Sequence, residues 1–412
     1  MKIDKNALVI SFYTNLPGSC QAEWVDDRMN ALIDKGFKIT LISSRGVFKH
    51  KNDSIRHIRI PCINPHGAKS EFNEIESRNI KINLYLKFYY RVMAFIDFIL
   101  KKIGLETGEG RWNWTLSSLF SLFYGHGKYT FIYSTGGPAS VHILGIVYAK
   151  LLRSKLFIEL QDPLTGEDIG RNKFSKLGLS LFEKFFVKNA YRVIYCTKNA
   201  CKYSKESYPK YEKKIHHIYP GSYLEQGVES KYFSEKKIRF TYLGSLYSTR
   251  NVTNLIEAIE KLHEYNPTYL NKFKIDLFGN IEEKILNEIK SFKHDIFVVN
   301  GLVSRELALN ESLKSDVLLL IQNTDNRSMN TIPFKTYDYL RTGKLIFALT
   351  YNNKEINNLL TDHNHIVADA SNFENIYHGL KKIIDNISEL NFKITKSKLT
   401  PMKAVEEMLE LL

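Results

Sequence analysis

The most regular feature of the sequence is an alternation of short apolar runs with longer segments of helical periodicity. In the first half, apolar runs of strand length occur at Leu8–Tyr13, Phe37–Ile42, Thr130–Tyr133, Leu156–Leu160 and Arg192–Cys196. Segments such as Glu23–Lys35 and Ser140–Leu152 have the longer, helical spacing and lie between such runs. Because continuous apolar runs of this length are typical of strands buried on both faces, the alternation predicts an α/β domain with a parallel sheet.

The second half of the sequence repeats this pattern. Its apolar runs occur at Ile238–Leu243, Lys274–Phe278, Ile296–Val299, Val317–Ile321, Leu345–Leu349 and His365–Val367. The stretch between the halves, Tyr219–Lys237, is polar and contains Pro220, Gly221 and Gly227, which is typical of a linker. We therefore expect two α/β domains, over residues 1–218 and 219–395, followed by a last helix within 396–412 that Thr400 and Pro401 open.

One segment, Ile80–Ile103, departs from the alternation. It has apolar and aromatic residues at helical spacing, including Leu84, Phe88 and Phe95, and five basic residues against one aspartate. A basic, aromatic amphipathic helix can lie in the interface of an anionic membrane. A helix packed on its own domain with solvated lysines gives the same pattern, so both interpretations stay open.

The composition narrows the class of partner. The 412 residues are 44% hydrophobic and 25% charged, as in ordinary globular proteins, and the formal net charge is +14. Such a charge implies an anionic partner, which can be nucleic acid, a membrane surface or a phosphorylated small molecule. The basic residues are dispersed without a nucleic-acid-binding motif, so we expect no nucleic acid. No GxGxxG follows the first strand, which disfavours an NAD enzyme.

The lack of a recognisable targeting signal and the pattern of cysteines favour a cytoplasmic protein. The first apolar run is too short for a signal-peptide core, and no window holds the ~18 uncharged apolar residues of a membrane-spanning helix. The four cysteines form no CxxC pair and match no metal or disulfide pattern, so free thiols in a reducing compartment are expected. We expect a cytoplasmic location, with peripheral attachment to the inner membrane face as an option.

The segment Thr331–Gly343, TIPFKTYDYLRTG, lies between two predicted strands. Pro333 and Gly343 are placed like helix start and stop signals. Helix N-termini at the carboxyl ends of parallel strands bind phosphate groups, and Lys335 and Thr336 would lie in the first turn of this helix. Asp338 lies one turn further on, where its carboxylate can accept hydrogen bonds from sugar hydroxyls. A capped surface helix would also fit the pattern.

A second motif follows the strand that opens the second half. Gly244 permits a tight turn after that strand, and Arg250 begins the next helix, where it can bind a phosphate bidentately. Alone, Arg250 is as well explained by a surface salt bridge. Since strand ends converge on one crevice of an open parallel sheet, Arg250 and Lys335 can together clamp one diphosphate. The polar loop ending at Asn330 would then face a sugar.

These motifs resemble the donor-binding domain of bacterial family 4 glycosyltransferases. The resemblance rests on FTYLGSLYSTRNVTNLIEAI, SDVLLLIQN and IPFKTYDYLRTGKLIFAL, and extends in order over nearly the whole chain. It implies the GT-B fold, with two Rossmann-like domains facing an interdomain cleft and a C-terminal helix, 396–412, crossing back to the N-terminal domain. It also implies a retaining transfer from a nucleotide sugar.

The family motif transfers to single residues. Arg250 falls at the usual lysine of the GxL…KG motif, Lys335 at the lysine of a PxK variant, and Asp338 at the ribose-binding second glutamate of the EX7E motif. There are two departures from the pattern. Ser245 replaces a frequent arginine, and Asn330 replaces the first glutamate of EX7E. These departures leave the donor sugar open.

The first half offers candidates for the acceptor side. Pro17 and Gly18 follow the first strand and resemble the glycine loop of GT-B N-terminal domains. Gly136 and Gly137 end another strand. Asp162 follows a third strand in a segment like the RDPW stretch of some family 4 enzymes, where it can orient or deprotonate the attacking hydroxyl. An Asp-Pro turn is its alternative explanation.

The expected function is therefore transfer of a sugar from a nucleoside-diphosphate sugar, UDP before GDP, to a glycan or lipid-linked acceptor of a bacterial surface polysaccharide. We expect no metal and no other cofactor, since retaining GT-B enzymes use protein cations and no DxD motif is present. A GT-B sugar-nucleotide epimerase or hydrolase, or a catalytically degenerate nucleotide-sugar binder, would share the donor site. The sequence leaves these alternatives open.

Overall fold

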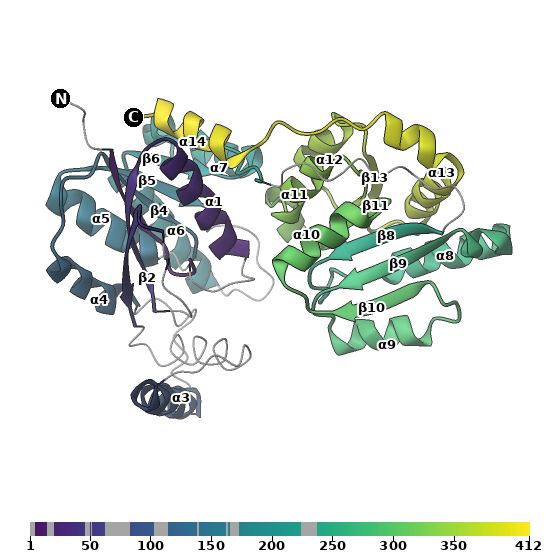
Figure 1. Ribbon diagram of the computed structural model, residues 1–412, viewed down its shortest axis with the longest axis horizontal. Coiled ribbons are helices and arrows are strands. Elements are labelled where there is room, and N and C mark those ends of the chain that lie inside the picture. Colours follow the sequence, from purple (N-terminus) through teal and green to yellow (C-terminus); the bar gives the residue numbers. More distant parts are fainter. Residues whose placement is uncertain are drawn as a thin grey trace.

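The computed structural model contains two α/β domains that lie side by side (Figure 1). The structure describes residues 5–14, 20–45, 50, 52–61, 83–102, 114–137, 140–161, 164, 173–223 and 237–412. Asp162, Pro17 and Gly18 therefore lie outside the described residues.

The N-terminal domain carries the first half of the alternation. Its elements are β1 (Asn6–Ile10), α1 (Cys20–Asp34), β2 (Lys38–Ser44), β3 (Ile55–Ile60), α3 (Leu84–Lys102), α4 (Trp114–Ser118), η1 (Leu119–Tyr124), β4 (Phe131–Thr135), α5 (Ser140–Leu152), β5 (Lys155–Leu160), α6 (Lys173–Asn189), β6 (Arg192–Tyr195), α7 (Lys198–Ser207), η2 (Pro209–Lys214) and β7 (Ile215–His217).

The C-terminal domain carries the second half, and the last helix follows it. The elements are β8 (Ile238–Leu243), α8 (Thr253–Tyr265), η3 (Pro267–Asn271), β9 (Phe273–Phe278), α9 (Glu283–Ser291), β10 (Phe297–Gly301), α10 (Arg305–Lys314), β11 (Val317–Ile321), η4 (Asn326–Asn330), α11 (Lys335–Thr342), β12 (Leu345–Thr350), α12 (Lys354–Thr361), β13 (Ile366–Asp369), α13 (Phe373–Phe392) and α14 (Pro401–Glu410).

Each domain is built on one parallel sheet. The strand order is β3-β2-β1-β4-β5-β6-β7 in the N-terminal domain and β10-β9-β8-β11-β12-β13 in the C-terminal domain. All described strand pairs are parallel. In both sheets the chain starts at an inner strand, adds strands toward one edge, and then continues on the other side of the first strand. The carboxyl ends of β1 and β4, and of β8 and β11, therefore lie at a topological switch point.

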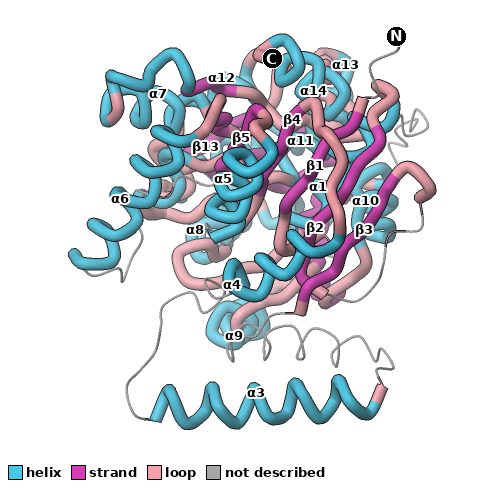
Figure 2. The backbone as a smooth tube through the Cα atoms, turned by 90° about the vertical axis from the view of Figure 1, so that its left-hand side faces the viewer, coloured by secondary structure: helices cyan, strands magenta, loops and turns pink. Residues whose placement is uncertain are grey.

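Helices cover both faces of each sheet, which explains the uninterrupted apolar runs (Figure 2). In β1, Leu8 and Ile10 pack toward α5, whereas Ala7 and Val9 pack toward α1 and α14. The C-terminal sheet is layered in the same way, with α8 and α13 on one face and α11 and α12 on the other.

The expected strands are largely found, and among the described residues the chain also forms two strands that the pattern did not predict, β3 and β7. β8 and β11 have the predicted bounds, and β12 continues one residue beyond the expected Leu349. β3 was missed because its sequence IRHIRI mixes apolar with basic residues, and β7 because it has only three residues, IHH. Both lie at edges of the sheet. Among the described helices, none has both the length and the apolar content needed to cross a membrane.

The chain passes between the domains twice. It leaves the N-terminal domain after β7 and returns after α13, so that α14 packs against α1. Ala404, Val405 and Met408 of α14 are buried in the core that β1 and α1 share. The two passages lie against each other, since the Ser222 amide donates to the Leu399 carbonyl at 3.3 Å.

Candidate functional site

The segment that contains Gly244 and the start of α11 meet at the carboxyl end of β8. The Nζ atom of Lys335 donates to the carbonyl of Leu243 at 2.8 Å and lies 3.7 Å from the ring centroid of Tyr242. From the same helix, Tyr339 accepts the Leu243 amide at 3.1 Å. A Cβ atom on Gly244 would lie 3.2 Å from Lys335 Nζ. The two segments, about 90 residues apart in the sequence, thus form one surface.

Arg250 also lies beside Tyr242, in the loop before α8 and not at the start of that helix as predicted. Its guanidinium faces the Tyr242 hydroxyl, and its Cζ atom is 5.4 Å from the ring centroid of Tyr247. The Nε atom of Arg250 is buried and has no hydrogen-bond partner among the described residues. The structure therefore brings Lys335 and Arg250 to the same aromatic side chain, Tyr242, with Lys335 also beside Gly244.

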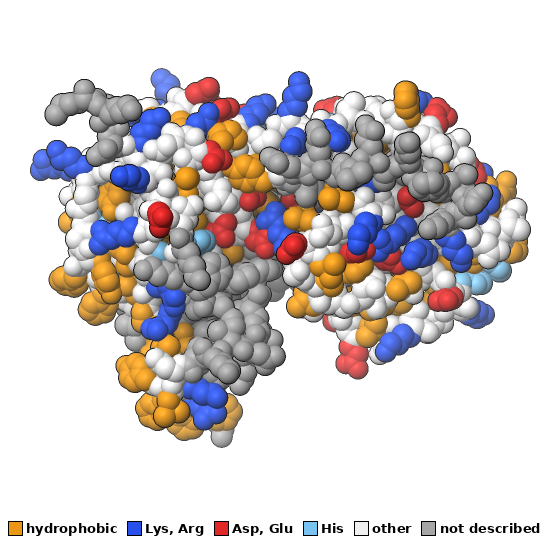
Figure 3. Space-filling model, in the orientation of Figure 1, with side chains coloured by type: hydrophobic (Ala, Val, Ile, Leu, Met, Phe, Trp, Pro, Cys, Tyr) orange, Lys and Arg blue, Asp and Glu red, His pale blue; other side chains and the backbone are white. Residues whose placement is uncertain are grey.

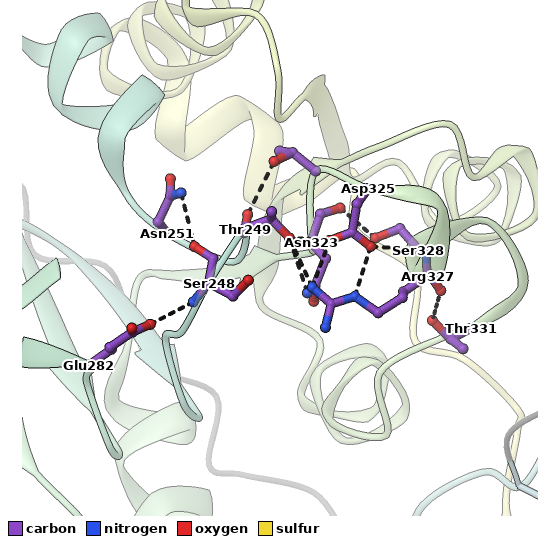
Figure 4. A network of polar contacts seen from close by, with 10 residues as sticks. Ser248, Thr249, Asn251, Glu282, Asn323, Asp325, Arg327, Ser328 and Thr331 are labelled. Carbon is purple, nitrogen blue, oxygen red and sulfur yellow. Dashed lines mark hydrogen bonds and ion pairs between the residues drawn. The ribbon is translucent and has the colours of Figure 1, made fainter. Parts of the chain in front are cut away.

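A polar network fixes the two loops that flank this surface (Figure 4). Arg327 pairs bidentately with Asp325, at 2.8 Å through Nε and 2.7 Å through Nη2. The Thr249 hydroxyl donates to the same Asp325 carboxylate, and the Thr249 carbonyl accepts the Thr324 amide at 3.3 Å. These bonds to Arg327 and Thr249 lower the pKa of Asp325. The loop after β11 is thus attached to the loop after β8 and has little freedom to rearrange.

Asn330 and Thr336 frame the entrance to α11. Asn330 is the last residue of η4 and is half-buried, and its carbonyl accepts the Thr197 hydroxyl of the N-terminal domain at 2.9 Å. Thr336 is fully buried, and its hydroxyl has no partner among the described residues. The side chain of Asn330 thus lies beside a domain contact, and Thr336 offers an unused hydroxyl group one residue from Lys335.

Asp338 is buried on α11 and engaged by two groups. Its Oδ1 atom accepts a hydrogen bond from the Ser222 hydroxyl and lies 3.3 Å from Nη2 of Arg305. Burial raises the pKa of the Asp338 carboxyl, and the opposing effects of Arg305 and Ser222 only partly offset it. In this conformation the carboxylate that the motif assigns to a ribose is occupied by protein groups.

Arg305 was not anticipated from the sequence, and it joins the two domains. It begins α10, and its Nη1 atom pairs with Glu23 on α1 of the other domain. Nη2 lies 3.9 Å from Asp27. Burial and the neighbouring carboxylates of Asp27 and Glu23 raise the pKa of Asp26 to about 8. Burial raises the pKa of Asp27 to about 7, against the opposing charge of Arg305.

Polar side chains surround the glycines at the end of β4. A Cβ atom at Gly136, which has φ +83°, would lie 3.5 Å from Ser11 Oγ and 3.7 Å from Gln161 Oε1. At Gly137 it would lie 3.7 Å from Gln21 Nε2. Ser11 Oγ, Gln161 Oε1 and Gln21 Oε1 are buried without hydrogen-bond partners among the described residues. This edge of the N-terminal sheet therefore offers groups suited to sugar hydroxyls.

A buried ion pair supports the end of β5, two residues before the predicted Asp162. Arg28 on α1 donates to Glu159 at 2.8 Å and to the carbonyl of Pro220 at 3.1 Å. Glu159 also accepts bonds from Tyr133 and, at 2.9 Å, from Thr135. With its partners all supplied by protein, Glu159 holds strand ends in place and is not available to a substrate.

His142 on α5 lies in the core. Its Nδ1 atom is 2.7 Å from the Ser134 hydroxyl, and burial lowers the pKa of its imidazole to about 3. The ring is therefore neutral at physiological pH.

The fold has counterparts among solved structures. An α,α-trehalose-phosphate synthase (UDP-forming) from Burkholderia xenovorans, in complex with glucose-6-phosphate, matches with a TM-score of 0.64 at 8% identity over 99% of this chain and 99% of that one. A putative UDP-N-acetylglucosamine 2-epimerase from Listeria monocytogenes matches with a TM-score of 0.54 at 10% identity, over 99% and 95%.

MnaA of S. aureus, solved with UDP, matches with a TM-score of 0.51 at 12% identity over 100% of this chain and 98% of that one. No protein-family profile matches the sequence, and no curated protein does. At these identities the likeness establishes the fold, so the predicted architecture of two Rossmann-like domains in the GT-B arrangement is confirmed.

Proposed function

We propose that this chain is a retaining, family 4-like glycosyltransferase, which moves a sugar from a nucleoside-diphosphate sugar to a glycan or lipid-linked acceptor in bacterial surface polysaccharide synthesis. The observation that carries the proposal is the pair of cations, Lys335 and Arg250, that both lie against Tyr242. Lys335 lies at the start of α11 against the Gly244 turn, and Arg250 lies in the loop that follows this turn. Such a position in a parallel sheet suits a diphosphate.

In the proposed reaction, the bond between the sugar and the diphosphate breaks and negative charge develops on the leaving group. Lys335 and Arg250 would stabilise that charge, and Thr336 would add a hydroxyl donor. No metal is needed for this step. Asp162 would orient the acceptor hydroxyl or take its proton. Closure of the domains would exclude water from the activated sugar.

UDP is the favoured base. The Burkholderia xenovorans enzyme is UDP-forming, and S. aureus MnaA was solved with UDP, so the fold accommodates this nucleotide in two different proteins. GDP remains the second choice for this chain. Asp338 would reach the ribose after exchanging Arg305 for the sugar hydroxyls, an exchange that opening of the domains would permit.

A thermal-shift measurement tests the donor site. UDP at ~100 times its dissociation constant should add about 2.7 kcal/mol of stability and raise the melting temperature by several degrees. Lys335→Ala should abolish the shift. Lys354→Ala is the matched control, because Lys354 also opens an eight-residue helix after a parallel strand but is exposed. Equal shifts in both variants, or no shift with any nucleoside diphosphate, would count against the proposal.

A sugar-nucleotide epimerase is the second candidate, because the L. monocytogenes protein shares this fold. The two activities differ in the need for an acceptor. Enzymatic release of free UDP, or conversion of the sugar, in the absence of any acceptor would favour an epimerase or hydrolase. Acceptor-dependent release would favour the transferase, and binding without turnover would indicate a degenerate binder.

The acceptor side includes a membrane in our proposal. Helix α3 exposes large apolar side chains, among them Leu84 (84% exposed) and Phe88 (68% exposed), and Phe123 of η1 is 85% exposed. Lys87 and Arg91 add exposed positive charge, and such side chains gather at the lower end of the N-terminal domain (Figure 3). This combination of aromatic and basic groups suits an anionic lipid surface.

Cosedimentation with liposomes tests the membrane contact. The chain should bind vesicles with anionic headgroups at low salt, and Phe88→Asp should release it. Leu302→Asp is the control, since Leu302 is 75% exposed on the other domain. If the chain stays in the supernatant, or if both variants bind equally, α3 is not a membrane contact and the acceptor is soluble.

A further inference from the structure

Three side chains with the chemistry of metal ligands meet on the outer part of the C-terminal domain. Glu260 and His263 lie one turn apart on α8, and His294 lies in the connection between α9 and β10. One ligand atom from each residue lies within 4.8 Å of the other two. Glu260 Oε2 is 3.4 Å from His294 Nε2, and the two imidazole ring centroids are 4.4 Å apart.

We propose that Glu260, His263 and His294 bind a divalent transition-metal ion, with zinc as the best fit. Two imidazole nitrogens and one carboxylate oxygen are typical zinc donors, whereas magnesium and calcium prefer oxygen alone. Three protein ligands leave a fourth tetrahedral position for water. All three side chains are partly exposed, so an ion can reach them and the donors can close to bonding distance by small rotations.

An ion pair between Glu260 and His294 explains only part of this arrangement. Such a pair requires a protonated His294, and it gives no role to His263, whose ring lies against the same imidazole. Two protonated imidazoles at this separation would repel each other. A metal ion uses both rings in their neutral form and places the carboxylate opposite a positive charge. Phe292, with its ring centroid 5.2 Å from that of His294, helps to hold the His294 ring.

The position of the three residues indicates what the ion would do. They lie at the last turns of α8 and just before β10, whereas the loop with Gly244 and Arg250 lies before the first turn of α8. β10 is the edge strand of its sheet, and Val298 and Val299 are about 40% exposed. The ion would tie this weakly covered strand to α8 (Figure 1). The inference is independent of the proposed function, because no sugar-binding group is involved.

Isothermal titration calorimetry of the full-length chain tests the site, after expression without a histidine tag and treatment with a chelator. Zinc chloride should bind with one ion per chain. Loss of a residue that merely supports a metal ligand weakens binding 10–100-fold, so loss of a ligand in His263→Ala or His294→Ala should weaken it by about 100-fold or more. His378→Ala, an exposed histidine on α13, should bind like the wild type.

Thermal melting separates a lost ligand from a damaged fold. Without metal, His263→Ala and His294→Ala should melt like the chelated wild type, and only the wild type and His378→Ala should gain several degrees with zinc. The proposal is overturned if the wild type binds no zinc at micromolar concentrations. It is equally overturned if binding survives unchanged in both His263→Ala and His294→Ala, because the ion would then lie elsewhere.

Discussion

Arg305 lies 3.3 Å from the buried carboxylate of Asp338 and pairs at the same time with Glu23 of the other domain. The helix that carries the candidate donor residues is therefore linked to α1 through one guanidinium. Glu23, Asp27 and Asp338 all face Arg305, so three carboxyl groups surround one cation. Under the proposed function, a ribose bound at Asp338 would take the place of Arg305 there.

Removal of Arg305 should expose this coupling. Arg305→Ala leaves Asp338 buried without its cation, and since Arg305 is partly exposed we expect a loss of about 2 kcal/mol in the free energy of unfolding, less than for a fully buried pair. Asp338→Asn removes the charge that needs the cation, so the double variant should lose less than the sum of the two single variants. Urea unfolding of the four proteins measures this difference. Additive losses would mean that the two residues do not interact energetically.

The raised pKa of Asp26 predicts a dependence of stability on pH. The native state keeps a proton on Asp26 up to about pH 8, whereas the unfolded chain releases it near 3.8, so stability falls as the pH rises through this window. Asp26→Asn stays neutral, and it should be about 1 kcal/mol more stable than the wild type at pH 8, after allowance for solvent screening. At pH 4 the two should be equal.

Melting temperatures between pH 4 and pH 8 test this expectation for Asp26. Asp53→Asn, which changes an exposed aspartate, serves as the control and should follow the wild type throughout. A wild-type melting temperature that rises relative to Asp26→Asn as the pH is raised would contradict the assigned sign. The comparison is needed because Glu23, Asp27, His50 and Arg305 also titrate or carry charge beside Asp26.

Gly279 supports the turn at Gly244 by close packing. A Cβ atom there would lie 2.3 Å from the carbonyl oxygen of Gly244, and its φ of +126° also excludes other residues. Gly279→Ala should push the Gly244 turn away from Lys335 and weaken nucleotide binding by about tenfold, or 1.4 kcal/mol.

Gly301→Ala is the matched control for Gly279→Ala. Gly301 also has a positive φ, +71°, but a methyl group added there would meet no atom within 4 Å, so the variant should lose about 1 kcal/mol of stability through backbone strain alone. Its nucleotide affinity should be unchanged. Calorimetric titration with the preferred nucleotide measures both variants, and equal affinities would show that the loop tolerates the displacement.

Glu355 links α12 to the start of α7 across the domain boundary. Its carboxylate accepts the Lys198 amide at 2.6 Å, the Asn199 amide at 2.9 Å and the Tyr219 hydroxyl at 2.8 Å. Glu355→Gln turns one acceptor into a donor that faces these donors, and should lower the free energy of unfolding by about 2 kcal/mol. Glu410→Gln, at an exposed position on α14, should have no effect in the same urea titration. Equal stabilities of the two variants would refute a role for the Glu355 contact.

The buried strands and the limits of the α11 helix could be predicted because the local sequence pattern determines them. Val317–Ile321 forms a strand as expected, because a strand covered on both faces must be apolar at every position. The α11 helix begins at Lys335 and ends before Gly343, which has the left-handed conformation expected of a helix stop. Parallel strand order then brings Gly244, Arg250 and Lys335 to one edge.

The part that sequence did not predict depends on contacts between distant residues. Arg305 and Glu23 are 282 residues apart, and nothing in the local pattern of α10 distinguishes this arginine from a surface residue. The same holds for Glu159, whose partner Arg28 lies on another helix. The proposed metal site also combines two segments, Glu260 and His263 on α8 and His294 before β10.

The two passages of the chain between the domains limit how the domains can move. Ser222 is hydrogen-bonded to Leu399, and only glycine fits at position 221, where a Cβ atom would lie 2.5 Å from the Thr400 carbonyl carbon. A single connection would let one domain rotate about several axes relative to the other. Two connections held side by side allow a hinge motion about one axis and resist rotation about the other axes. Each closure of the domains therefore brings the same two domain surfaces together in the same relative position.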